Sequence, residues 1–241
     1  MQMPPFLVGV DVGLMADYTA LSFIELRKVT IGSVTQYEYH ARCLNRFELG
    51  TPYPDMVEKT AGLLKKLPGP AAWQEDQRRI QRDTPSHRQP PPQPLFLLIV
   101  DATGVGRGPV DMFSRLGVRC IRVTITGGDA MTNPVGDEWH VPKPTLVGAF
   151  QVVLQTRRFK VATSIPAASI LEKEALNFRY KIDNETGHDS YNAWRREGSH
   201  DDLLLSVCMC VWYGEKNPPA PDRLWRPKPA PMMNIRNNTN V

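Results

Sequence analysis

The sequence predicts an α/β protein with a central mixed sheet of five strands or more and helices on both faces. Three observations lead to this prediction. Three strand-like segments with short turns open the chain, which is typical of an antiparallel meander. Two runs, FLVGVD at 6–11 and LFLLIVD at 95–101, are apolar up to a final Asp, as expected of strands covered on both faces. Helical segments and a further strand follow, and a meander joined to β-α-β units gives a mixed sheet.

The first half of the chain supplies four of the expected strands. The first is Phe6 to Asp11, and a turn containing Gly13 follows it. The others are expected at Thr19 to Leu26, Thr35 to Phe47 and Leu95 to Val100. A helix is expected between the third and fourth strands, at Pro54 to Leu67, with Pro54 near its start. Its predicted inner face consists of Met56, Ala61, Leu63, Leu64 and Leu67.

The second half supplies one more strand and most of the helices. A Gly-rich turn, TGVGRG at 103–108, leads into a helix at Pro109 to Leu116, and a fifth strand follows at Val118 to Ile125. Helices are then expected at Lys143 to Arg157, with Leu146, Phe150, Val153 and Leu154 inward, and at Ile165 to Tyr180, with Ala168, Leu171, Ala175 and Leu176 inward. A polar loop or hairpin at 184–199 precedes the last helix, Asp201 to Glu215, which is nearly all apolar and is expected to pack on the sheet. This order of elements is that of the ribonuclease-H-like fold.

The domain organisation follows from length and from the distribution of proline. With 241 residues, of which 41% are hydrophobic, the chain is expected to form one domain at residues 1–216. The stretch 68–94 is rich in Pro, Gln and Arg, and we interpret it as a surface insertion. Residues 217–241 are rich in Pro and Asn, and we interpret them as a flexible tail.

Composition narrows the class of protein only slightly. The formal charge of +4 is compatible with a polyanionic partner, but many enzymes share it. The four cysteines lack zinc-site spacing, and we expect them to be free thiols. No apolar run approaches the length of a membrane span, and the N-terminus does not resemble a signal peptide. We therefore expect a cytoplasmic protein without a membrane partner.

Four acidic residues stand where strands end or a helix begins. Asp11 and Asp101 end the two apolar runs, and Asp201 and Asp202 open the last helix. In the ribonuclease-H-like order, the first and fourth strands lie side by side at the centre and a late helix crosses their ends, so these acids are expected to converge. Carboxylates that converge on one point are ligands for Mg²⁺ or Mn²⁺. Each acid alone has a simpler interpretation, as a turn former or a helix cap, and only the joint pattern favours a site.

A two-metal phosphodiester hydrolase is the chemistry that this pattern favours. Two ions activate a water and stabilise the leaving oxygen, and they need several carboxylates, at least one of them bridging. Asp11 is the expected bridging ligand, with Asp101 and Asp202 completing the two sites. Asp17, six residues after Asp11, and Asp201 are further candidate ligands. His200 could assist proton transfer or contact a phosphate.

Basic residues give a weaker indication of a nucleic-acid surface. The candidates for DNA contacts are Lys143, Arg157, Arg158, Lys160, Arg195 and Arg196. Ordinary solvated side chains explain them equally well or better, and Lys143 could contact the site instead of DNA. The TGVGRG turn lacks the Lys-Ser/Thr ending of a nucleotide-binding loop, so a tight turn before a helix is the favoured interpretation.

Several of these segments together resemble one known family. VGVDVG followed by Asp17, then IVDATGVGRG, then VPKPTLVGAFQVVLQTRRFKV, LEKEALNF and GSHDDLLLSVCM look like the nuclease domain of the large subunit of tailed-bacteriophage terminases. The resemblance spans roughly residues 6–213. It implies a ribonuclease-H-like nuclease that cuts concatemeric viral double-stranded DNA during genome packaging with two divalent metal ions, Mg²⁺ or Mn²⁺. The metal ligands would be Asp11, Asp17, Asp101 and the pair Asp201-Asp202, with Asp202 favoured within that pair.

The sequence departs from that family in one respect. Terminase large subunits also carry an ATPase motor, and no Walker-type phosphate loop is found here. We therefore expect an excised domain or a nuclease encoded apart from its motor, with a separate packaging ATPase, a small terminase subunit or a portal as partner. For a viral protein, the location would be the host cell cytoplasm.

Other functions remain open at the level of sequence. A stand-alone junction resolvase of the same superfamily would require a dimer and prefer branched DNA. A non-catalytic packaging or scaffold module would keep the fold without activity. An actin-like or sugar-kinase-like ATPase opens with a similar strand, but it needs two such domains, for which 241 residues leave no room.

Overall fold

A computed structural model describes residues 3–13, 17–69, 71–84, 94–178 and 200–219. The strands of the sheet are β1 (Phe6–Asp11), β2 (Ala20–Ile31), β3 (Val34–Arg46), β4 (Phe96–Asp101), β5 (Cys120–Thr126), β6 (Thr132–Val135), β7 (Glu138–Pro142) and β8 (Phe159–Val161). The helices are α1 (Tyr53–Lys65), α2 (Ala71–Asp83), α3 (Arg107–Arg115), α4 (Lys143–Gln155), α5 (Ala168–Asn177) and α6 (Asp202–Lys216), with a short 3-10 turn at Gly104–Gly106.

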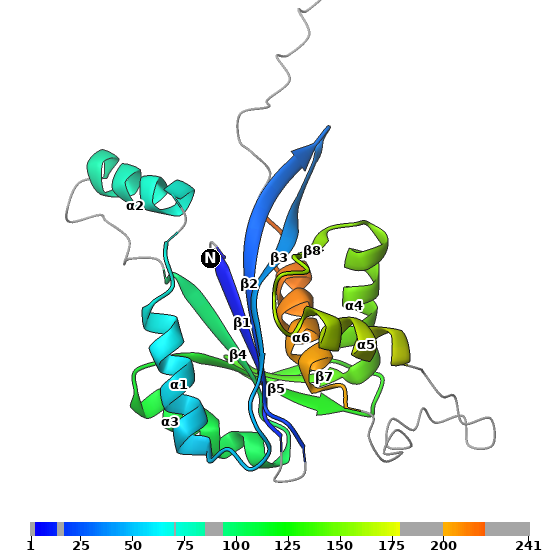
Figure 1. Ribbon diagram of the computed structural model, residues 1–241. Coiled ribbons are helices and arrows are strands. Elements are labelled where there is room, and N and C mark those ends of the chain that lie inside the picture. The colour runs from blue at the N-terminus through cyan, green and yellow to red at the C-terminus, as the bar shows by residue number, and fades with distance from the viewer. Residues whose placement is uncertain (1–2, 14–16, 70, 85–93, 179–199, 220–241) are drawn as a thin grey trace, which may run out of the picture.

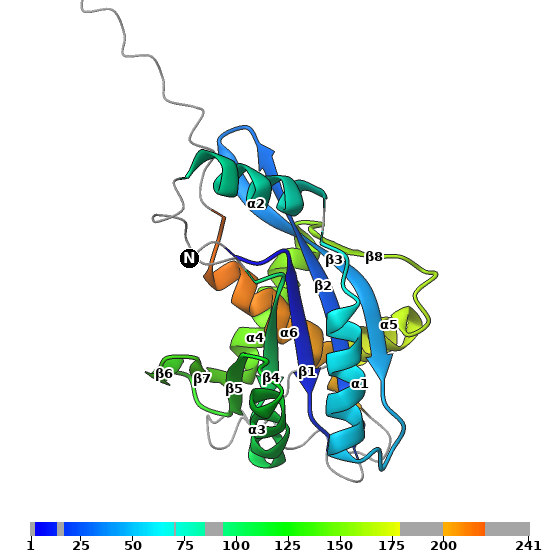
Figure 2. The same ribbon diagram turned by 90° about the vertical axis from the view of Figure 1, so that its left-hand side faces the viewer.

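One eight-stranded sheet runs through the molecule in the order β6-β7-β5-β4-β1-β2-β3-β8 (Figure 2). The strands β1, β2 and β3 pair antiparallel as the predicted meander, and β1 pairs in parallel with β4, which pairs in parallel with β5. The prediction of a mixed sheet with the first and fourth strands side by side at its centre is confirmed. The fold is the ribonuclease-H-like α/β arrangement expected from the sequence.

Helices cover both faces of this sheet (Figure 1). Strand alternation explains the two layers, because successive side chains of β1 and β4 point to opposite faces. Leu7 of β1 and Ile99 of β4 join the core formed with α4, α5 and α6. Val8 of β1 and Val100 of β4 join the core formed with α1 and α3. Both faces of β1 and β4 are therefore covered by helices, which explains why these two strands are apolar along both sides.

Helix α6 is the most deeply buried helix of the described part of the chain. Every residue from Asp202 to Gly214 is buried, which explains why its sequence is apolar around the whole circumference. Asp202 is thus placed at the buried end of a core helix. Even with α6 included, no described helix combines the length and the hydropathy that crossing a membrane requires.

The structure corrects several expectations about faces and elements. Leu63, Leu154 and Leu176 were expected to point inward, but they are 39%, 43% and 75% exposed. These helices bury only a narrow stripe, and the three leucines lie beside it. Helix α2, within the segment interpreted as an insertion, and strands β6, β7 and β8 were not predicted. These strands have three to five residues each, too few for a clear alternation.

Candidate functional site

Asp11 and Asp101 lie next to each other where the two central strands end. The parallel register pairs Val10 with Val100, so the residues that follow are neighbours across the sheet. Alternation places Asp11 on the same side of β1 as Leu7, which belongs to the core under α6. Both carboxylates are buried, with residue exposures of 7% and 9%. Two acids are therefore held on rigid strands beneath the α6 layer.

A close approach between α6 and β1 brings the other two acids to this point. A Cβ at Gly9 would lie 2.0 Å from the carbonyl oxygen of Ser206, so only glycine allows the helix to lie this close to the strand. Gly9 stands two residues before Asp11, and Ser206 stands one helical turn after Asp202. The first turn of α6 therefore lies over the ends of β1 and β4. The fold therefore brings Asp11, Asp101, Asp201 and Asp202 into one region, near enough that, after burial, the other three charges raise the pKa of Asp11.

Burial and mutual repulsion set the protonation of the inner pair. The pKa of Asp11 is raised well above its ordinary value by burial and then by the charge of Asp101. Burial also raises the pKa of Asp101, while the hydroxyl and N–H of Thr103 favour its charged form. The Thr103 N–H donates to Asp101 Oδ1 at 2.8 Å. The pair is therefore poised to share a proton unless a cation is present.

The Gly-rich turn after β4 serves to hold Asp101. A Cβ at Gly106 would lie 1.8 Å from the Asp101 carbonyl oxygen, and Gly104 has φ +60°. The Thr103 hydroxyl accepts a hydrogen bond from the N–H of Ile125 at 2.8 Å, which ties the turn to β5. Residues 103–106 thus form a tight turn before a helix, as the favoured interpretation had it, and Arg107 and Gly108 already belong to α3.

Lys143 reaches the site from the first residue of α4, directly after β7. Its Nζ lies 2.6 Å from Oδ2 of Asp201, and its charge also lowers the pKa of Asp11 and of Asp101. The side chain is 14% exposed, and the ammonium stands 5.6 Å from the ring centroid of Phe178. Asp201 is therefore not a helix cap through its side chain, because its carboxylate is taken by this lysine.

Arg46, at the end of β3, lies between the carboxylates of Glu174 and Asp202. Its Nη2 pairs with Glu174 Oε1 and lies 3.8 Å from Asp202 Oδ2. Glu174 Oε2 also accepts the N–H of Leu204 at 2.7 Å, which fixes α5 to the start of α6. Burial raises the pKa of Glu174 to about 7 and that of Asp202 to about 6, against the effect of Arg46 on both. Oδ2 of Asp202 is buried and has no hydrogen-bond partner.

Asp17 and His200 border Asp202. His200 Nδ1 lies 3.6 Å from Asp202 Oδ2, and the charge of Asp17 contributes to the raised pKa of Asp202. The ring of Tyr18 meets the His200 ring edge-on at 4.9 Å and lies 4.5 Å from the Arg46 guanidinium. Both predicted residues therefore belong to the surroundings of the acidic cluster.

The residues present fit a hard divalent cation, although the acids are not arranged as a closed cage. The donor set consists of carboxylate oxygens, and one of them, Asp202 Oδ2, is buried without a hydrogen-bond partner, with Arg46 and His200 at ion-pair distances of 3.8 and 3.6 Å. Burial of such an oxygen is costly unless a cation or donor compensates it. Within the described residues, however, no three His, Cys, Asp or Glu side chains surround one point closely enough to hold an ion. Asp201 is directed to Lys143 and Asp202 faces Arg46, so these two acids face basic side chains.

Apart from Lys143, described above, the basic residues proposed as DNA contacts divide into three groups. Arg158 is a correction: its side chain is 8% exposed and its guanidinium donates to both oxygens of Glu215 at 2.6 and 2.8 Å. Glu215 stands 13 residues after Asp202 on α6, roughly 20 Å along the helix, so this ion pair is remote from the acids. Arg157 and Lys160 are exposed beside it. Arg195 and Arg196 lie outside the described residues.

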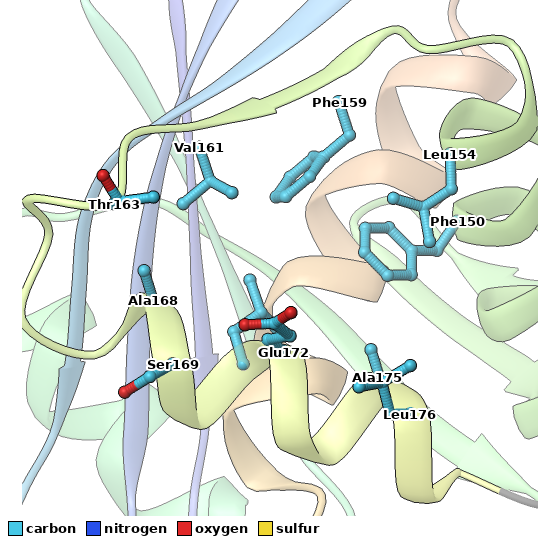
Figure 3. Close-up of a pocket in the computed structure, with 11 residues that line it drawn as sticks. Phe150, Leu154, Phe159, Val161, Thr163, Ala168, Ser169, Glu172, Ala175 and Leu176 are labelled. Carbon is cyan, nitrogen blue, oxygen red and sulfur yellow. The ribbon is translucent and has the colours of Figure 1, made fainter.

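A pocket of about 440 Å³ lies on the same face of the sheet but away from the acids. Figure 3 shows it between α4, β8 and α5, with the rings of Phe150 and Phe159 on one side and Ala168 and Ala175 on the other. Its one charged lining residue is Glu172. The pocket is therefore an apolar feature separate from the acidic cluster.

Sequence reasoning missed Glu174, Arg46 and Tyr18. The signal for Glu174 was its place three residues after buried Leu171, on the apolar stripe of α5. An acid on such a stripe requires a partner, and Arg46 is that partner. Arg46 and Tyr18 carried no comparable signal, because their role depends on how the β2–β3 meander ends beside α6.

Comparison with known proteins adds a likeness in fold. No protein-family model and no curated protein matches the chain. Two solved structures of the large terminase nuclease from thermophilic phage G20c are similar to it. The one with bound zinc gives a TM-score of 0.47 at 16% identity, covering 85% of this chain and 78% of that one. The other gives 0.49 at 15% identity, covering 85% and 80%. At this identity, function has to be argued from the side chains described above.

Proposed function

We propose that the protein is a metal-dependent endonuclease that hydrolyses phosphodiester bonds of double-stranded DNA. The observation that supports this most is the contact between Asp11 and Asp101, buried at the ends of the two central strands beneath the start of α6. Two carboxyl groups placed in this way oppose each other's ionisation and cost stability. A fold that places them together on rigid strands is explained if a cation binds between them.

The ligands in this proposal are carboxylates of three separated segments. Asp11 would bridge, Asp101 and Asp202 would complete two positions, and Asp17 and Asp201 would complete the donor set. Mg²⁺ or Mn²⁺ suits these oxygen donors. Two such ions, when bound, supply an activated water and stabilise charge on the leaving oxygen.

The chain itself contributes rigidity, exclusion of water and proton transfer. Burial of the acids keeps bulk water away from the reacting phosphate, which strengthens electrostatic interactions there. The N–H of Thr103 fixes one oxygen of Asp101, and the pairing of β1 with β4 fixes Asp11. His200, 3.6 Å from Asp202, is placed to hold or pass a proton or to contact a phosphate.

The biological setting proposed here comes from the sequence resemblance to terminase nuclease domains. It favours cleavage of viral DNA during genome packaging, in the cytoplasm of an infected host. The described residues provide no motor, so the proposal includes a packaging ATPase, with a small terminase subunit or portal as further partners. The exposed Arg157 and Lys160 remain candidates for weak contacts with the DNA backbone.

The test is cleavage of supercoiled, linear and four-way-junction DNA by the purified chain with Mg²⁺, Mn²⁺ or EDTA. We expect metal-dependent cutting of double-stranded DNA that Asp101→Asn abolishes and Asp137→Asn leaves intact, because Asp137 pairs with Arg119 at the surface. Preferential cutting of the junction would favour the resolvase-like alternative. Absence of cutting, with metal bound, would favour a scaffold module.

A further inference from the structure

Lys143 occupies a place in the acidic cluster where a cation is needed. Its ammonium lies 2.6 Å from Asp201 Oδ2 and close enough to Asp11 and Asp101 to lower the pKa of both. It is the first residue of α4, immediately after β7, so its backbone is fixed by the sheet. The chain itself thus places one positive charge among these acids, in direct contact with Asp201.

We propose that Lys143 is a built-in counter-ion of the acidic site, which competes with the divalent cation and has to leave Asp201 when the cation binds. This inference rests on the proposed function and deepens it. Lys143 is then a positioning residue that sets the metal affinity, rather than a contact for the DNA backbone. Its low exposure of 14% and its direct ion pair fit the first role better than the second.

The physical reason is like-charge repulsion at short range in a buried site. A divalent ion held by Asp11 and Asp101 would meet the field of the same ammonium that now partly neutralises them. Asp201 Oδ2 cannot serve the ammonium at 2.6 Å and a hard cation equally well, because both compete for its lone pairs. Release of the lysine would free Asp201 to turn toward the other acids, which in the present arrangement do not enclose an ion.

The experiment measures Mn²⁺ affinity by calorimetry, without DNA, for the wild-type chain and for Lys143→Gln. Removing the competing charge should tighten binding by about tenfold, whereas the metal-free protein should melt at a lower temperature because its acids lose their counter-ion. Lys65→Gln, at an exposed position of α1, is the matched control and should change neither quantity. An equal or weaker Mn²⁺ affinity of Lys143→Gln would overturn the proposal.

A second pair of variants, of which the double variant removes both charges of the ion pair, separates this role from a purely structural one. Asp201→Asn is compared with the double variant Lys143→Gln/Asp201→Asn. If the lysine competes through its charge, the double variant binds Mn²⁺ more tightly than Asp201→Asn alone. The reason is that the ammonium no longer repels a metal ion held by Asp11 and Asp101. If Lys143 acts only by orienting Asp201, the two variants bind equally, which would refute competition. Failure of the wild-type chain to bind Mn²⁺ would instead refute the proposed metal site itself.

Discussion

Asp202→Asn should stabilise the metal-free protein, and the gain should grow with pH. Burial raises the pKa of Asp202 from 3.8 to about 6, and one pKa unit corresponds to about 1.4 kcal/mol, so the ionised carboxylate costs the fold about 3 kcal/mol at pH 8. A carboxyl group whose pKa is higher in the folded protein than in the unfolded chain favours folding in its protonated form. This stability is fully present below the unfolded-state pKa and is lost as pH rises through the folded-state pKa. The isosteric amide removes this cost, and the gain should be about half as large at pH 5.

The assay is urea unfolding in EDTA at pH 5 and pH 8, with the free energy of unfolding of the variant compared with wild type at each pH. Asp137→Asn is the control, because Asp137 pairs with Arg119 outside the acidic cluster. Added Mn²⁺ should raise the melting temperature of wild type more than that of Asp202→Asn. A gain that is absent at pH 8, or equal at both pH values, would show that ionised Asp202 does not destabilise the fold.

Three further predictions concern packing, an ion pair and pH. In urea unfolding, Gly9→Ala should lower the free energy of unfolding by at least about 2 kcal/mol, because its Cβ would lie 2.0 Å from the Ser206 carbonyl oxygen. Gly62→Ala, on α1 with open space around it, should be neutral or stabilising in the same assay. Arg158→Met should cost about 2 kcal/mol by breaking the buried pair with Glu215, whereas Arg157→Met should cost little, and equal effects would contradict the assigned burial. The Mn²⁺ affinity measured by calorimetry should rise from pH 5.5 to pH 7.5, because Asp11 and Asp202 have raised pKa values and must lose their protons when the metal binds. An affinity that does not change with pH would count against these two residues as ligands.

The central part of the fold could be predicted because its signals are local. The apolar runs that became β1 and β4, the meander and the all-apolar α6 each follow from a pattern within one segment. Their order then placed Asp11 beside Asp101 and beneath Asp202. The short strands β6, β7 and β8 could not be predicted, because strands of three to five residues take their form from the neighbours they pair with.

The surroundings of the acids were harder to predict than the acids themselves. Arg46 reaches Glu174 and Asp202 only because β3 ends beside the first turn of α6, and nothing near Arg46 in the sequence indicates this. The same limit applies to Arg158, which looks like part of a solvated basic cluster until the last turn of α6 supplies Glu215. Contacts between segments more than fifty residues apart decide these roles.

The most direct test of the central claim is an anomalous diffraction map from crystals of the chain soaked in Mn²⁺, compared with crystals of Asp11→Asn. We expect an anomalous peak bounded by Asp11, Asp101 and Asp202 in the wild-type crystals, which weakens or disappears in the variant. No peak at the ends of β1 and β4, or an identical peak in Asp11→Asn, would contradict it.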